Sequence, residues 1–376
     1  MRMEPENSMQ HRCMQSKGDH MNTSVNPPLS AFFREEILTF IKRRLLLPVC
    51  LLVFAFCFSC GQSADKDAQA DDRRLIEIAN RINDDFSKIR EEVSKLAQFT
   101  AFLYIPETMA QNASKVDPSG YKLHDNGVFY KPVDDGKCAV FVSGVLPVSE
   151  EIKKIVYGTE PLETRLMEIV ERYPEVVQSY YNDRNSYNRI YPYFDVITQY
   201  EPKMDIPKYN FYYLADNAHN PEKKAVWVKE PYVDPAGRGW MVSAIAPVYV
   251  DGVLEGVPGL DVTINAITDR YIGTENADLV LLDASATVVS IQDHLTTLLS
   301  LPPLDNHKYL ETIRSDTYRT DDYNLLKSRS REVRNMAQRI FQENQTNVTF
   351  QKDGKLLRVT SVNIPELDWK LMQIFY

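Results

Sequence analysis

Acidic and aromatic side chains recur together between residues 209 and 261. The members of this set are Tyr209, Phe211, Tyr212, Trp227, Tyr232, Asp234 and Asp261. An ionised aspartate only accepts hydrogen bonds, and an aromatic face attracts a cation by about 0.5–2 kcal/mol. A pocket built from these residue types would therefore suit a ligand that carries an amine or another cationic group. The alternative interpretation is that the rings fill the core of a tyrosine-rich sheet and that Asp261 caps the end of a strand.

Other kinds of site chemistry find little support in the sequence. The histidines after the leader, His124, His219, His294 and His307, show no i,i+4 pairing and no neighbouring ligand at metal spacing, so no metal site is predicted. The chain has no G-x-S-x-G, P-loop or G-x-G-x-x-G motif, so we expect no catalytic residues, no cofactor and no enzyme. A hydrolase that uses the two aspartates of the set remains as an alternative.

Length and charge restrict the class of protein. The chain has 376 residues, with 43 Lys and Arg against 52 Asp and Glu, and a formal net charge of −9. The length corresponds to about two domains. The negative charge argues against a nucleic-acid partner, because such a protein needs a basic face.

The N-terminal 60 residues have the order of an export signal. Basic residues 42–44 precede an apolar run over 45–59, which is short for a membrane-spanning helix of about 20 residues. Cys60 ends the run and resembles the lipidated cysteine of bacterial lipoproteins, although Cys57 and Phe58 depart from that motif. This resemblance implies a lipid on Cys60 that holds the protein on a membrane, facing the periplasm or the cell exterior. An uncleaved anchor is the alternative.

Cys138 is the one cysteine after this leader. A single thiol cannot form an intrachain disulfide. Because Cys138 lies in an apolar run over 138–142, we expect it to be a small core residue.

The rest of the chain predicts an α+β fold. After a polar linker over 61–71, apolar residues recur at helical spacing over 72–104, which predicts a long stalk helix, with a coiled coil as the alternative. Further helices are predicted at 149–157, 162–182, 264–271 and 322–343. Strands are predicted at 128–130, 138–142, 225–229, 239–248, 258–263, 280–282, 288–290, 346–351, 355–362 and 368–375.

Four successive elements over residues 211–262 carry a resemblance to a known family. They are Phe211-Tyr-Tyr-Leu-Ala, Pro231-Tyr-Val-Asp234, Pro247-Val-Tyr249 and Gly256-Val-Pro-Gly259-Leu-Asp261. In this order they resemble the double Cache (dCache, PDC-type) extracytoplasmic sensor family. The resemblance covers about residues 72–376 and implies two PAS-like antiparallel-sheet subdomains after the helix. Residues 105–270 would be the membrane-distal subdomain with the ligand pocket, and 271–376 the membrane-proximal one.

The resemblance also implies site residues. Tyr232, Asp234 and Asp261 match pocket positions, and Phe211 with Tyr212 matches a Trp-Tyr pair of the family. Amino-acid-binding members place at the position of Tyr209 an arginine that clamps the ligand carboxylate. Lys208 or Arg189 could replace it, but without that arginine the set favours an amine over an amino acid.

The predicted function is that of a lipid-anchored, exported module that binds a small amine or amino-acid-like molecule. No kinase or other output segment follows the last predicted strand, so the signal would pass through a partner such as a sensor kinase or a transporter. A structural or adhesion lipoprotein with a vestigial pocket is the main alternative.

Overall fold

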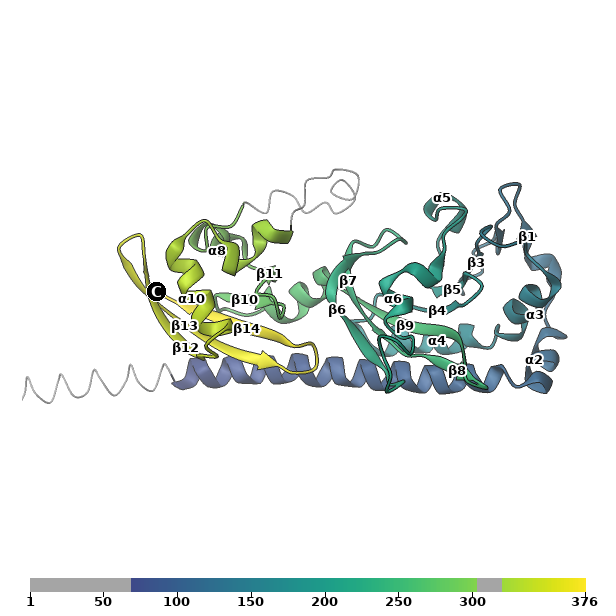
Figure 1. Cartoon of the computed structure of the whole chain (residues 1–376), viewed down its shortest axis with the longest axis horizontal. Helices are drawn as coiled ribbons and strands as arrows, with labels where there is room; N and C mark the ends of the chain where they lie inside the picture. The colour runs from purple at the N-terminus through teal and green to yellow at the C-terminus, as the bar shows by residue number, and fades with distance from the viewer. Residues whose placement is uncertain (1–68, 303–319) are drawn as a thin grey trace, which may run out of the picture. The chain divides into compact units, whose positions relative to one another are not determined.

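The computed structural model describes residues 69–302 and 320–376 (Figure 1). These residues belong to one compact unit, Gln69–Tyr376. The export signal predicted over residues 1–60, its lipidation site Cys60 and most of the predicted linker lie outside the described residues. Within the described ranges, no helix is long and apolar enough to cross a bilayer.

A long helix occupies residues 69–103, as the spacing of apolar residues predicts. Most of those residues form one stripe along the helix, and seven of them are buried: Leu75, Ile78, Ile82, Phe86, Ile89, Val93 and Leu96. Phe99 is partly buried, and Ile76, which is 45% exposed, lies outside the stripe. The stripe packs into a hydrophobic cluster with residues of both sheets. The helix is therefore held by packing within the chain, without a coiled-coil partner for this stripe.

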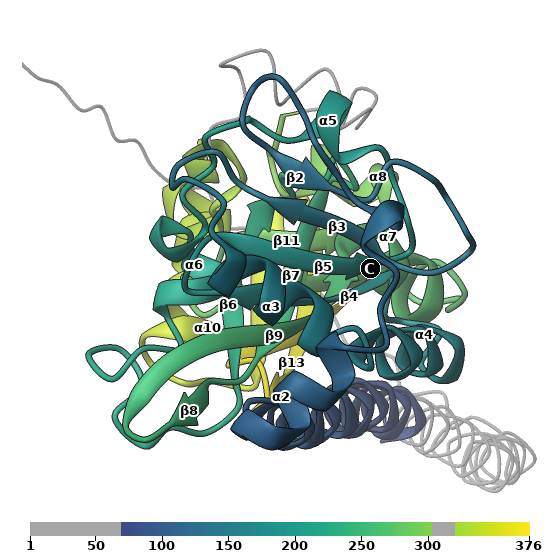
Figure 2. The same cartoon turned by 90° about the vertical axis from the view of Figure 1, so that its right-hand side faces the viewer.

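A larger antiparallel sheet follows the helix, and nine strands of the described chain form it. They are β1 (Lys122–Leu123), β2 (Phe129–Tyr130), β3 (Ala139–Val142), β4 (Gln178–Asp183), β5 (Tyr187–Tyr191), β6 (Val226–Val233), β7 (Trp240–Ile245), β8 (Val248–Val250) and β9 (Val253–Thr263). The strand order is β1-β2-β3-β5-β4-β9-β7-β6, and β8 pairs with β9. Figure 2 shows β2, β3, β5, β4 and β9 side by side in this order.

Short helices lie before, between and after the strands of this sheet. They are α2 (Pro106–Ala113), α3 (Glu150–Gly158), α4 (Leu162–Arg172), α5 (Val196–Gln199), α6 (Asn210–Tyr213) and α7 (Ile264–Ile267), with 3-10 turns at Pro118–Gly120 and Ile206–Lys208. The helix predicted over 162–182 is wrong in its second half, because α4 ends at Arg172 and β4 follows. Pro174 disfavours helical backbone at the residue before it, and β4 is fully buried between two neighbouring strands.

A smaller antiparallel sheet ends the described chain. Its strands are β10 (Leu279–Leu282), β11 (Val288–Ile291), β12 (Asn347–Lys352), β13 (Lys355–Ile364) and β14 (Trp369–Phe375), in the order β11-β10-β14-β13-β12. A π-helical turn (Thr268–Ile272), α8 (Asp293–Leu298), 3-10 turns at Thr320–Tyr323 and Leu325–Lys327, and α10 (Arg331–Phe341) accompany it. The helix predicted over 322–343 therefore begins later than expected, where the Ser330 side chain accepts a hydrogen bond from the backbone N–H of Val333. The predicted α+β class, with a long helix before two antiparallel sheets, is confirmed.

One junction ties the long helix to both sheets. The Phe86 ring lies 5.0 Å from that of Trp227 on β6 and 6.4 Å from that of Trp369 on β14. Glu366, in the β13–β14 turn, accepts a hydrogen bond from Trp227 Nε1 at 3.0 Å and forms an ion pair with Arg90 of the helix. A displacement of β6 would therefore act directly on the helix and on the smaller sheet.

Gly259 on β9 permits a close crossing of strand and ring. It pairs with Tyr180 of β4, and a Cβ atom at Gly259 would lie 2.2 Å from the Tyr180 ring. We expect Gly259→Ala to lower the free energy of unfolding by about 1–3 kcal/mol, as overpacking of a core does. Urea denaturation measures this change. Gly120→Ala is the matched control because no atom lies within 4 Å of its Cβ position; equal effects of the two substitutions would contradict the prediction.

Candidate functional site

Three polar side chains form a row across the larger sheet. Asp261 on β9 lies opposite Gln178 on β4 and opposite Ser243 on β7. Residues directly opposite each other in a sheet have Cβ atoms about 4.5–5.5 Å apart. All three are buried, with at most 1% of their surface exposed. The sheet therefore carries a buried polar row in an otherwise apolar region.

Asp234 joins this row from the turn between β6 and β7. Gln178 Nε2 donates hydrogen bonds to Asp261 Oδ2 at 2.5 Å and to Asp234 Oδ2 at 3.2 Å. The Asp234 carboxylate also accepts from the backbone N–H groups of Ala236 and Arg238, at 2.9 and 3.1 Å. Asp234 and Asp261 thus both accept a hydrogen bond from the Gln178 amide. Backbone N–H groups of the β6–β7 turn also hold the Asp234 carboxylate in place.

Tyr232 reaches Asp261 through Ser243. The Ser243 hydroxyl donates to Asp261 Oδ1. A serine hydroxyl has one hydrogen, so the contact between the Ser243 and Tyr232 oxygens has the tyrosine as donor. Burial raises the pKa of Tyr232 well above its usual value, which keeps this hydroxyl neutral.

A small cavity lies beside the two aspartates. Its volume is about 20 Å³, and aromatic rings form much of its wall: Tyr180, Tyr200, Phe211 and Tyr232. The Phe211 ring lies 5.8 Å from that of Tyr232 and 6.1 Å from that of Tyr180. This volume holds about one water molecule. The protein's own side chains therefore fill the position of any larger ligand in this conformation.

Three buried side-chain oxygens of the wall have no hydrogen-bond partner among the described residues. Two are the amide acceptors Gln178 Oε1 and Asn188 Oδ1, and the third is the Tyr180 hydroxyl, which can accept as well as donate. A buried polar atom without a partner costs about 1–3 kcal/mol. None of the described residues that line the cavity is a lysine or an arginine. The wall therefore offers acceptors to a ligand that donates hydrogen bonds.

The charge state of the aspartates follows from their burial. Burial raises the pKa of Asp261 to about 8, and the nearby Asp234 carboxylate adds to the shift. Burial also raises the pKa of Asp234, against the hydrogen bonds from its own turn. Asp261 thus holds a proton near neutral pH, and a cation in the cavity would favour its release.

Only some of the predicted ligand-binding residues line the small cavity. Asp234, Asp261, Tyr232 and Phe211 line the cavity, whereas Tyr209, Tyr212 and Trp227 do not. Tyr209 stacks on Phe211 with ring centroids 5.1 Å apart. Tyr212 is buried in the apolar cluster on the same side of the sheet.

Trp227 differs most from the prediction. Neighbouring residues of a strand face opposite sides of a sheet. Val228 packs in the cluster that contains Tyr232, while Trp227 packs in the cluster of the long helix. Trp227 therefore belongs to the junction with Glu366 and lies outside the cavity wall.

Neither predicted substitute for the missing arginine lies at the cavity. Arg189 is fully buried elsewhere, where it donates to Glu163, to the Tyr187 hydroxyl and to the carbonyl of Val156. Lys208 is exposed and pairs with Asp205 at 2.8 Å. The position that would hold a ligand carboxylate is thus without a guanidinium among the described residues of the wall.

Gln178, Tyr180, Asn188 and Ser243 were missed by the sequence analysis. The first two lie where a helix was predicted, although the alternation of Gln178, Tyr180 and Asn182 has the period of a strand. Among the residues that the structure describes, no group of three or more His, Cys, Asp or Glu could hold a metal ion. Cys138 is buried, as predicted, and burial raises the pKa of its thiol to about 12.

No family model matches the chain, and no curated protein matches it in sequence. Solved structures with a related arrangement include the ligand-binding domain of the Pseudomonas aeruginosa PAO1 amino acid chemoreceptor PctB with L-Arg, at 12% identity and a TM-score of 0.43, covering 80% of this chain and 92% of that one. The domain of the Campylobacter jejuni chemoreceptor Tlp3 with L-valine has 11% identity and a TM-score of 0.40, with coverage of 81% and 95%. That of the Pseudomonas fluorescens chemoreceptor CtaA with L-serine has 14% identity and a TM-score of 0.35, with coverage of 79% and 96%. The chain is thus similar, at low identity, to ligand-binding domains of bacterial chemoreceptors.

Proposed function

We propose that the chain is an extracytoplasmic sensor module that binds a small molecule bearing a primary amine in the cavity beside Asp234 and Asp261. The observation that carries the proposal is the buried cluster of acceptors. Two carboxylates, two unpartnered amide oxygens and the unpartnered Tyr180 hydroxyl line it, without a cationic side chain among the described residues of the wall.

An ammonium group matches this cluster in number and kind of hydrogen bonds. It has three donors and no acceptor, and it could donate to Asp261, to Gln178 Oε1 and to Asp234. The faces of Phe211 and Tyr232 would add a cation–π attraction. A free carboxylate on the ligand would find no arginine, so we expect simple amines to bind at least as well as amino acids.

Binding requires the cavity to widen. The residues that close it include Tyr200, Met204 and Ile206, which lie in the segment between β5 and α6. A ligand that binds only the wider state shifts the population toward that state. Ligand binding would therefore be coupled to an outward displacement of this segment.

Strand β6 offers a route from the cavity to the rest of the fold. It carries Tyr232 at the cavity and Trp227 at the junction with Glu366 and Arg90. In this proposal residues 105–270 are the ligand-binding subdomain and residues 271–376 the second one. A lipid on Cys60 would anchor the module, and a partner such as a sensor kinase or a transporter would read the shift.

A thermal-shift screen tests the proposed ligand class. It compares L-norvaline, butylamine and valerate, which offer an amine with a carboxylate, an amine alone and a carboxylate alone. A ligand at 100 times its Kd stabilises the native state by about 2.7 kcal/mol, so we expect the two amines to raise the Tm by a few degrees and valerate to leave it unchanged. No shift with any amine, or a shift with valerate alone, would contradict the proposal.

The small cavity volume favours a second candidate, a structural module with a vestigial pocket. In that case the side chains that fill the cavity never move outward. The same screen separates the two candidates when it is widened to di- and polyamines, amino acids and quaternary ammonium compounds. A vestigial pocket predicts that none of them raises the Tm.

The affinity for an amine should rise with pH between about 6 and 8. With the Asp261 pKa at about 8 in the unliganded protein, the carboxyl must release its proton before it pairs with an ammonium. One released proton corresponds to about tenfold tighter binding per pH unit. Titration calorimetry in two buffers of different ionisation heat measures this proton. A constant affinity over this range, without proton release, would show that Asp261 does not pair with the ligand.

A further inference from the structure

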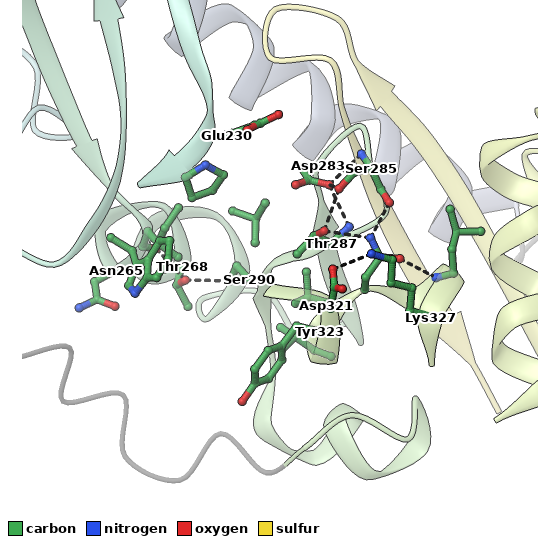
Figure 3. Close-up of a pocket in the computed structure, with 18 of the residues that line it drawn as sticks. Glu230, Asn265, Thr268, Asp283, Ser285, Thr287, Ser290, Asp321, Tyr323 and Lys327 are labelled. Atoms are coloured by element: carbon green, nitrogen blue, oxygen red, sulfur yellow. Dashed lines mark hydrogen bonds and ion pairs between the residues drawn. The ribbon is translucent and has the colours of Figure 1, made fainter. Parts of the chain in front are cut away.

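A second, larger cavity lies between the two sheets of the described chain, and it shares no lining residue with the first (Figure 3). Its volume is about 560 Å³, within the range of about 300–1,000 Å³ for ligand pockets. Glu230 of β6 and Thr268 lie on one side of it, and the β10–β11 turn with Asp283 and Ser285 lies on the other.

The side-chain donors of the β10–β11 turn are used within the wall. The Ser285 hydroxyl donates to Asp283 Oδ1 at 2.7 Å, so its 2.8 Å contact with the Thr287 hydroxyl has Thr287 as donor. Asn324 uses its amide hydrogens on the Ser285 carbonyl at 2.7 Å and on Thr287 Oγ1 at 3.0 Å. None of these groups has a hydrogen left for a ligand.

On the opposite side of the cavity, the hydroxyl hydrogens are also used in hydrogen bonds within the protein. The Thr268 hydroxyl donates to the Ile264 carbonyl at 2.8 Å. Its 2.7 Å contact with Ser290 therefore has Ser290 as donor, which leaves Ser290 with free lone pairs only. Asn265, exposed at the rim, is the exception, since its amide keeps its hydrogens.

Asp283 presents an unused oxygen to this cavity. Its side chain is nine-tenths buried. It accepts from Ser285 N, Thr287 N and the Ser285 hydroxyl, at 2.7–2.8 Å, and all three bonds go to Oδ1. Oδ2 has no partner among the described residues. Because no described residue donates to this oxygen of a lining carboxylate, it can accept a charged hydrogen bond from a ligand.

Apart from Lys327, which pairs with Asp321, the charged side chains of the wall are all acidic. Glu230 and Asp293 form no ion pair with any described residue, and Lys327 is bound to Asp321 at 2.6 Å. Ile264, Val288 and Leu326 supply apolar surface. The described residues hold no group of three or more metal-binding side chains. Acceptors, negative charge and apolar surface together match an organic cation.

The acidic groups are spread along strand β11. Asp283 is level with Thr287 at one end of β11, and Asp293 lies just beyond the other end. The six residues from Thr287 to Asp293, at about 3.3 Å each, place the two aspartates on the order of 20 Å apart along the strand. We propose that this cavity is a second ligand site, which binds an extended organic cation with two or more amine groups, such as a polyamine.

Titration calorimetry of the purified protein with spermidine tests this proposal. Asp283→Asn keeps an oxygen for the turn and removes the charge of the free oxygen, so we expect spermidine binding at this site to weaken at least tenfold. Glu230→Gln changes an exposed residue without a described partner, and it should weaken spermidine binding about threefold. Because this substitution is on the surface, it tests the site even if Asp283→Asn fails to fold. Asp251→Asn, in an exposed turn of the larger sheet, is the matched control and should leave binding unchanged.

Asp261→Asn separates this site from the proposed amine site. We expect it to leave spermidine binding at the second cavity in place. The inference is overturned if spermidine does not bind, if Asp283→Asn and Glu230→Gln bind it as tightly as the unaltered protein, or if Mg²⁺ at equal charge concentration displaces it completely, which would indicate only an acidic surface. Loss of all spermidine binding in Asp261→Asn alone would overturn this inference and still support the first site.

Discussion

Replacing Asp261 with asparagine should weaken the binding of an amine ligand about 100-fold. Asparagine has nearly the same shape but no charge, so the fully buried site would lose its charge-assisted hydrogen bond to the ammonium. Removing one partner of a buried, hydrogen-bonded charge pair costs about 2–5 kcal/mol in binding. Titration calorimetry with the best ligand of the screen measures the loss.

The stability of the unliganded variant distinguishes a binding effect from a folding defect. The folded-state pKa of Asp261, at about 8, lies above its unfolded value near 4. Its contribution to stability is therefore present below pH 4 and is lost as the pH rises through 8. Asp261→Asn removes this loss, so the Tm of the variant should fall less than that of the unaltered protein between pH 6 and 8.5. Unchanged ligand affinity in a folded Asp261→Asn protein would exclude Asp261 from the site.

Replacing Arg189 with methionine should lower the free energy of unfolding by about 3–5 kcal/mol, because it removes the closer ion-pair partner of the buried Glu163 and leaves only Lys131, at 3.6 Å. The Val156 carbonyl and the Tyr187 hydroxyl would each lose a donor as well. Chemical denaturation followed by circular dichroism measures this change.

Two further variants show whether the effect comes from the buried charge. Glu163→Leu combined with Arg189→Met should recover much of the stability, because apolar residues can replace a buried ion pair. Arg165→Met on the exposed surface of α4 should cost less than about 1 kcal/mol. If Arg189→Met left stability unchanged and weakened amino-acid binding, Arg189 would be a ligand clamp and this account of it would be wrong.

Features that depend on short-range patterns could be read from the sequence. The long helix follows from apolar residues at helical spacing, and its buried stripe is the one that the spacing predicts. Asp234 could be located by the resemblance of Pro231-Tyr-Val-Asp234 to a family motif, and its carboxylate accepts from the backbone N–H groups of Ala236 and Arg238 in the same turn. Each of these features is fixed by residues that are close in sequence.

Features that depend on tertiary pairing could not be read in the same way. Gln178 lies in a stretch whose apolar residues also fit a helix, and only pairing with β5 and β9 makes it a strand. Trp227 lies among the residues of the predicted pocket in sequence, but the alternation of β6 turns it toward the long helix. The larger cavity joins β6 to the β10–β11 turn, some 50 residues apart, and no local pattern indicates that they meet.

A crystal structure of the protein with its tightest-binding amine tests the central claim most directly. We expect the ligand nitrogen within hydrogen-bond distance of Asp261 and of Gln178 Oε1, with the segment that carries Tyr200 and Met204 displaced outward. A ligand whose amine points away from both aspartates, or a cavity that stays closed at saturating ligand concentration, would contradict the account.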